Sequence, residues 1–265
     1  MRAERSGRLE RWVSGCVLLA VLLAACAAVL IAVAGPGTRL GAWSFGTGFV
    51  LLRAGARLGI AAAAAGLLAG LGAGYLRRPG ELALAVLALA VGLAALGLPA
   101  YQLSKARSVP PIHDITTDWE QPPQFQALLA ERARALAPAE HDGPQVAEQQ
   151  RRAYPDIRPQ FFRDPPAAVF AATERVARAL DWDVAAAEPQ EGRLEATDTT
   201  FWFGFKDDVV VRIRPEGEGS RVDVRSKSRV GRSDTGTNAR RIREFLRRLH
   251  AAGLTPQGAS PRAGS

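Results

Sequence analysis

The sequence predicts a membrane anchor of about three transmembrane helices followed by a soluble α+β domain, in which an antiparallel four-stranded sheet has helices packed on one face. Charge divides the chain, since residues 1–104 hold 9 Lys and Arg against 3 Asp and Glu, whereas residues 105–265 hold 25 against 23. The first part contains long runs without charge, and the second shows short strand-like and helix-like patterns. These observations exclude a wholly soluble protein, a disordered chain and a disulfide scaffold.

Three uncharged runs are expected to be transmembrane helices, near residues 13–34, 58–76 and 82–103. The first is 22 residues long, which suffices to cross a hydrocarbon core of about 30 Å. The second carries glycines at intervals of four residues, namely Gly66, Gly70 and Gly74. Because this spacing lets a neighbouring helix approach closely, we expect the second and third helices to pair across the turn at residues 77–81.

Both cysteines, Cys16 and Cys26, lie in the first apolar run, so the soluble part has no cysteine for a disulfide, a metal or a catalytic thiolate. The string LLAAC, which ends at Cys26, resembles a bacterial lipobox and makes lipidation of Cys26 one alternative. The apolar run continues beyond Cys26, however. We therefore favour a membrane helix that happens to contain a cysteine.

The basic residues predict the orientation of the anchor. Six arginines fall on the cytoplasmic side if the N-terminus is cytoplasmic, namely Arg2, Arg5, Arg8, Arg11, Arg77 and Arg78. Five basic residues fall on the other side, namely Arg39, Arg53, Arg57, Lys105 and Arg107. This small majority predicts a multi-pass protein of the inner (cytoplasmic) membrane of a bacterium, with its soluble domain in the periplasm. A lipidated Cys26 leads to the same location, because two spans would then remain.

Residues 105–252 form the predicted soluble domain, and the Gly-, Ser- and Pro-rich residues 253–265 are expected to be disordered. The domain begins with a Pro-rich entry loop. It continues with a helical composition over residues 124–137 and an irregular stretch over 138–164. A further helix is expected to begin near Pro165, since proline suits the first turn of a helix.

Four strands follow in the prediction, over residues 182–187, 193–205, 208–214 and 220–229. The last two flank the turn EGEG and indicate a hairpin. In its expected register Val211 faces Val224 on the inner side of the sheet. On the outer side Arg212 faces Asp223, which is a favourable pair of opposite charges. The last helix is expected over about 237–251.

Three strings of the soluble part occur in the order PPIHDITTD, ATDTTFWFGFKDDVVVRIRP and SRVGRSDTGTNARRIREFL. Together they resemble the bacterial family catalogued as domain of unknown function 1499. The resemblance covers about residues 108–250, and members of that family often carry N-terminal membrane spans. It implies no activity, substrate or cofactor for any residue of this chain.

His113, Asp114 and Asp118 form a cluster of a histidine with two carboxylates. Such a set can hold a divalent metal or exchange protons, so a metal-assisted hydrolase that uses these three residues is an alternative function. No other histidine or carboxylate has a spacing that marks it as a further ligand. We favour the interpretation that Asp114 and its threonine neighbours stabilise turns, and we predict no metal and no cofactor.

The segment SRVGRSDTGTNARR, which joins the last strand to the last helix, is the predicted ligand site. Its candidate residues are Arg229, Arg232, Ser233, Asp234, Asn238 and Arg241, with Trp202 on an adjoining surface. Arginines and the free N–H groups of a helix N-terminus can bind a phosphate or a carboxylate. Cations at this end of a helix are unfavourable unless an anion offsets them. We favour Asp234 over an external ligand as that anion.

The outer side of the predicted hairpin adds five basic residues, namely Arg214, Arg221, Arg225, Lys227 and Arg229. This face would attract anionic lipid headgroups if it met the membrane. We favour a solvated sheet face as its interpretation.

The sequence thus favours a non-catalytic, envelope-associated module that binds lipid, a small anion or a partner protein. An enzyme is not expected, because P-loop, nucleophile-elbow and dinucleotide-binding motifs do not occur in a strand–turn–helix context. A structural scaffold that packs with other membrane proteins is a further alternative. Nucleic acid is not a predicted partner, because most of the net charge of +8 lies in the anchor.

Overall fold

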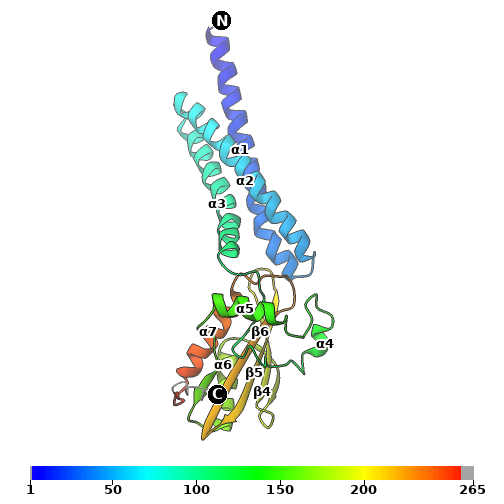
Figure 1. The fold of residues 1–265 in the computed structure, drawn as a ribbon. Coiled ribbons are helices and arrows are strands. Elements are labelled where there is room, and N and C mark those ends of the chain that lie inside the picture. Colours follow the sequence, from blue (N-terminus) through cyan, green and yellow to red (C-terminus); the bar gives the residue numbers. More distant parts are fainter. Residues whose placement is uncertain (1, 258–265) are drawn as a thin grey trace. The chain divides into compact units, whose positions relative to one another are not determined.

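The computed structural model describes residues 2–257 of the chain (Figure 1). They form two compact units. The first runs to Ser104 and includes residues 202–204, and the second holds the rest of the chain from Lys105 onward. Long apolar helices make up the first unit, and an antiparallel sheet with helices makes up the second, which confirms the predicted fold class.

Three helices form the anchor, namely α1 (Arg2–Arg39), α2 (Phe45–Tyr75) and α3 (Pro79–Arg107). Each of them is long and apolar enough to cross a membrane. α2 begins earlier than the span predicted near residues 58–76. Its start is fixed by Ser44, whose Oγ accepts a hydrogen bond from the Thr47 N–H at 3.3 Å.

Small residues line the buried side of α2, at Gly48, Gly55, Gly59, Ala62, Gly66, Ala69 and Ala73. A Cβ atom added to Gly66 would lie 2.8 Å from the carbonyl oxygen of Ala85 in α3. The two backbones therefore approach as closely as glycine permits. Of the three glycines expected to pair these helices, Gly66 makes this approach, whereas a Cβ atom on Gly74 would meet nothing within 4 Å.

A cluster of polar side chains joins the three helices at one end of the anchor. Arg78, in the turn between α2 and α3, contacts Glu10 of α1 at 2.8 Å and Glu81 of α3 at 2.7 Å. The hydroxyl of Ser14 donates to Glu81 at 2.9 Å. The beginning of α1 and the α2–α3 turn therefore lie at the same end of the bundle, as three alternating spans require.

The second unit is built on one antiparallel sheet. Its strands are β1 (Asp114–Thr116), β2 (Gln160–Phe162), β3 (Asp183–Glu188), β4 (Arg193–Thr199), β5 (Lys206–Glu216) and β6 (Gly219–Ser228). The strand order is β1-β6-β5-β4-β3, and β2 also pairs with β6. Its helices are α4 (Leu129–Arg132), α5 (Pro144–Ala153), α6 (Pro166–Ala179) and α7 (Thr237–His250).

The sheet therefore has six strands instead of the predicted four. β1 and β2 are three residues long, too short for an alternating pattern to reveal them. The strand predicted over 193–205 ends at Thr199, so Trp202 lies in the turn between β4 and β5 and not on a sheet face. The stretch 138–164, which was expected to be irregular, contains α5 and β2.

Part of the segment expected to be disordered is ordered beside β2. The carbonyl oxygen of Thr255 accepts a hydrogen bond from the Arg163 N–H at 2.9 Å, and the Gln257 N–H donates to Phe161 at 2.8 Å. The remainder of that segment, residues 258–265, lies outside the described residues.

The β5–β6 hairpin has the predicted register. Val211 lies opposite Val224, and Arg212 lies opposite Asp223. α6 and α7 pack on the face that carries these valines (Figure 1). Trp182 stacks on Phe245 of α7 with ring centroids 5.3 Å apart inside this core. The opposite face of the sheet is the one that carries charge.

Candidate functional site

The charged face of the sheet is buried. Arg225 and Lys227 of β6 and Asp208 of β5 are inaccessible to solvent. They lie beneath residues 117–143, a largely irregular stretch that we call the covering segment. The interpretation of this face as solvated is therefore wrong for these residues, because a part of the chain without periodic pattern folds over them.

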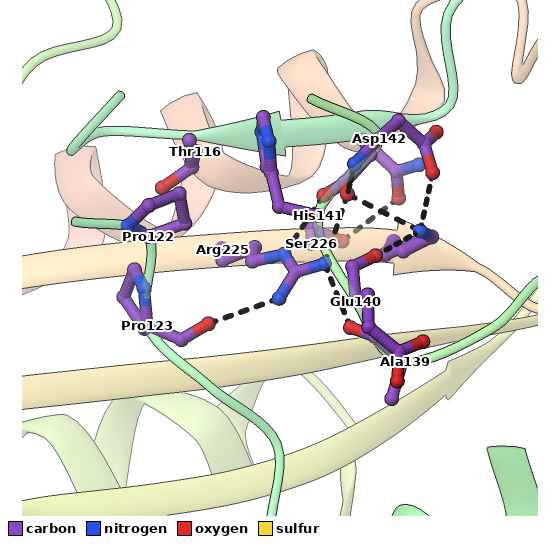
Figure 2. A network of polar contacts seen from close by, with 12 residues as sticks. Thr116, Pro122, Pro123, Ala139, Glu140, His141, Asp142, Arg225 and Ser226 are labelled. Atoms are coloured by element: carbon purple, nitrogen blue, oxygen red, sulfur yellow. Dashed lines mark hydrogen bonds and ion pairs between the residues drawn. The ribbon is translucent and has the colours of Figure 1, made fainter. Parts of the chain in front are cut away.

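Arg225 is the centre of the buried network (Figure 2). Its Nε and Nη2 atoms donate to the two carboxylate oxygens of Asp114, each at 2.9 Å. Its Nη1 atom donates to the carbonyl oxygen of Pro123 at 3.1 Å, and Nη2 also donates to that of Ala139 at 2.9 Å. One guanidinium group thereby fastens β1 and two distant parts of the covering segment to β6.

Lys227 lies between two carboxylates, with its Nζ atom 3.3 Å from Asp114 and 2.5 Å from Asp142. Burial alone would raise the pKa of Asp114, but the hydrogen bonds and charge of Arg225 hold it below its ordinary value. Burial would also raise the pKa of Asp142, but hydrogen bonds from His113 and Lys227 have the larger effect and lower it. Both carboxylates are therefore ionised at neutral pH and balance the two buried cations.

Asp208 is a second buried carboxylate with two cations. Its side chain accepts hydrogen bonds from Arg132 of the covering segment at 2.7 Å and from Arg229 at 2.8 Å. Phe125 contacts both Arg132 and Arg225, whose guanidinium carbons are 4.8 and 5.1 Å from the centre of the ring. These contacts are cation–π interactions in a desolvated setting, where such contacts are strongest.

Glu195 of β4 explains why the helix predicted over 124–137 does not begin before α4. Its Oε1 atom accepts hydrogen bonds from the N–H groups of Gln126 at 2.8 Å and Ala127 at 3.1 Å, and Oε2 accepts one from Leu128 at 3.0 Å. A buried carboxylate thus occupies consecutive N–H groups just before α4 begins. These residues are fixed to the sheet and cannot extend the helix toward the N-terminus.

His113, Asp114 and Asp118, which the alternative of a metal-assisted hydrolase requires together, are engaged by separate partners. His113 Nε2 contacts Asp142 at 3.0 Å, and Asp114 is held by Arg225. Asp118 accepts a hydrogen bond from Arg221 at 2.7 Å. Within residues 2–257 no group of three or more His, Cys, Asp or Glu side chains is arranged to hold a metal ion.

The predicted ligand site at the junction between β6 and α7 is largely satisfied from within. Arg229 pairs with Asp208, and Arg241 pairs with Asp198 and Asp207, both at 2.7 Å. Asn238 is buried and donates to the carbonyl oxygen of His113 at 2.8 Å.

Asp234 caps the start of α7 as expected, but Arg229 and Arg241 pair with other aspartates and not with Asp234. Its carboxylate accepts hydrogen bonds from the N–H groups of Gly236 at 2.8 Å and Asn238 at 2.6 Å. Burial nevertheless raises the pKa of Asp234 above its ordinary value, against the effect of these hydrogen bonds. The neighbouring Ser233 stabilises the same turn, because its Oγ accepts a hydrogen bond from the Thr235 N–H at 3.4 Å.

Three cations at this end of the sheet stay exposed, namely Lys206, Arg232 and Arg240, which we call the junction surface. Among the described residues, Arg240 donates to the carbonyl oxygen of Thr235 and to the hydroxyl of Thr237. No carboxylate pairs with any of the three within the described part of the chain. Arg232 was predicted as a site residue and Arg240 lies in the same predicted segment, whereas Lys206 was missed because it lies outside any motif that binds ligands.

An open cavity of about 330 Å³ lies at the opposite end of the hairpin, lined in part by Asp118, Arg214 and Arg221. Arg221 and Arg214 both contact Asp223 beneath it, at 3.0 and 3.1 Å. Because Glu120 and Glu216 also line the cavity, its charge is mixed and does not favour an anion.

Comparison with protein families places these observations in a known group. The family described as protein of unknown function (DUF1499) matches residues 114–249, which is just over half of the chain and includes every strand of the sheet. No curated protein matches the chain. Its three long apolar helices are consistent with a membrane protein. The chain belongs to the DUF1499 family of proteins of unknown function.

Proposed function

We propose that this protein is a non-catalytic, membrane-anchored module whose sheet domain binds an anionic ligand at the junction surface. The observation that supports this is that the buried charges are paired within the fold, whereas three exposed cations are not paired with a carboxylate among the described residues. The buried carboxylates Asp114, Asp208 and Asp223 each have arginine partners, whereas Lys206, Arg232 and Arg240 offer cations to solvent. An anion from outside is the partner that these exposed cations lack.

The alternative of a metal-assisted hydrolase has less support. A catalytic base or metal ligand needs a lone pair that substrate or metal can reach. The carboxylates of Asp114 and Asp118 are engaged by arginines, and His113 is buried against Asp142. The alternative of a structural scaffold has no specific observation in its favour.

We expect the N-terminus to be cytoplasmic and the sheet domain to be periplasmic. Arg8 and Arg11 of α1 lie at the same end of the helix bundle as Arg77 and Arg78, which supports an excess of arginine on one side. Alkaline phosphatase, which is active only outside the cytoplasm, should be active when fused after Ser104 and inactive when fused after Arg78. The reverse pattern would contradict this orientation.

Ligand capture is tested by native mass spectrometry of the full chain, purified in a mild detergent. We expect an anionic molecule to copurify with the wild-type protein and to be lost from the double variant Arg232→Gln/Arg240→Gln. Arg229 is left intact, because its removal would take a cation from buried Asp208. Arg163→Gln/Arg175→Gln, which removes two exposed arginines elsewhere, is the matched control. Equal retention by all three proteins would remove the proposed site.

A further inference from the structure

The junction surface lies where the sheet domain begins. The carbonyl oxygen of Ile112, just before β1, accepts a hydrogen bond from the Asp234 N–H at 3.3 Å. A Cβ atom added to Gly236 would lie 3.5 Å from Val109 Cγ1. The Arg229 N–H donates to the carbonyl oxygen of Lys206 at 3.0 Å. The entry segment, the start of β5 and the loop before α7 therefore meet at one end of the sheet.

The covalent connection from the last membrane span enters the domain at this end. Arg107 is the last residue of α3, a helix long and apolar enough to cross a membrane. Val109 follows it by two residues, which reach at most about 7 Å when fully extended. The loop beside Val109 is therefore tethered within roughly 15 Å of the end of α3. Arg107, itself exposed, adds a fourth cation to this region.

The arrangement of the cations fits a surface more closely than a small ligand. Asp234 already takes N–H groups at the start of α7, so these do not form an anion site of their own. Lys206, Arg232 and Arg240 are exposed side chains and line neither the cavity beside Arg221 nor the cavity beside Arg193. Flexible cations at a membrane surface attract anionic headgroups without needing a pocket.

We infer that the junction surface binds the phosphate groups of anionic phospholipids in the same bilayer that holds the spans. This inference rests on the proposed function, since it names the source of the anion. Each basic residue near an anionic surface strengthens the interaction roughly fivefold. The domain is thereby held against the membrane by charge as well as by its covalent tether.

The test is amide hydrogen exchange of the full chain in lipid nanodiscs, followed on peptides that cover residues 230–240. We expect exchange to be slower in nanodiscs with about one third phosphatidylglycerol than in pure phosphatidylcholine, as charge attraction to an anionic surface requires. High salt should abolish the difference, because it screens exposed charges. The variant Lys206→Gln/Arg232→Gln/Arg240→Gln should lose it. The control Arg134→Gln/Arg163→Gln/Arg175→Gln, which removes the same charge from other exposed positions, should keep it.

Three results would overturn the inference. Equal exchange in both lipids would show that the bilayer is not the source of the anion, and retention of the effect by the junction variant would show that other residues cause it. Equal slowing by inorganic phosphate in phosphatidylcholine nanodiscs would assign the site to a free anion. In each case the proposed function stands or falls separately, by the copurification experiment.

Discussion

Replacement of Asp208 by Asn is expected to destabilise the sheet domain by about 3–5 kcal/mol, because it leaves buried cations without their counter-charge. Arg132 is fully buried and contacts Asp208 at 2.7 Å, and Arg229 contacts the same carboxylate. The Asn side chain has nearly the same volume, so the loss would come from charge and not from a cavity. The free energy of unfolding is measured by unfolding the full chain in urea and detergent, with pulse proteolysis as the readout of the folded fraction.

The control for this prediction is Asp156→Asn. Asp156 also pairs with an arginine, Arg243, at 2.6 Å, but both side chains are about half exposed. The free energy of an exposed pair is about 0–1 kcal/mol. Similar losses in the two variants would contradict the view that burial makes the Asp208 pairs important.

Acidification is expected to lower the free energy of unfolding of the domain over two ranges of pH. The first range begins as the pH falls through about 6.5, the ordinary pKa of a histidine side chain. Burial lowers the pKa of His141 in the folded state, so the unfolded chain takes up the proton first and is favoured. The second and steeper range lies below about pH 4. Asp114 and Asp142 have pKa values below the ordinary one when folded, so their stabilisation is complete above that pH and is lost as the pH falls toward the folded values.

Asp234 acts in the opposite direction, because burial raises its pKa and the folded protein takes up its proton first. The prediction is checked by urea midpoints between pH 7 and pH 2, in wild type and in Asp142→Asn. The variant is expected to lose stability at pH 7 and to show a shallower fall below pH 4. An unchanged slope in the variant would mean that Asp142 does not contribute to the acid response.

The sequence was sufficient to predict the elements in which residue types alternate regularly along the chain. Val211 opposite Val224 and Arg212 opposite Asp223 agree on one register, and the structure has that register. The covering segment has no such repeat. Its position depends on contacts between residues far apart in the chain, such as Arg132 with Asp208 and Arg225 with Asp114. No local pattern indicates these contacts, so the alternating charges of β6 were interpreted as a solvated face.

The candidate site was predictable to a similar degree. The role of Asp234 at the start of α7 follows from its place before a helix. The pairing of Arg229 with Asp208 and of Arg241 with Asp207 requires knowledge of which face of β5 each aspartate occupies. Once these pairs are known, the exposed cations at this end of the sheet can be identified as Lys206, Arg232 and Arg240. Of these, Arg232 is a predicted site residue, Arg240 lies in the predicted segment, and Lys206 lies outside it.

The covering segment also has a consequence for the order of folding. Its binding sites on the sheet exist only after β1, β5 and β6 have assembled, because Asp114, Asp208 and Arg225 come from these three strands. Arg132 and Asp208 are 76 residues apart in the chain, so their contact closes a long loop. The segment should therefore dock after the rate-limiting step, and substitutions within it should accelerate unfolding while leaving the folding rate nearly unchanged. The lifetime of the folded domain would then be set by how tightly its charged cover is held.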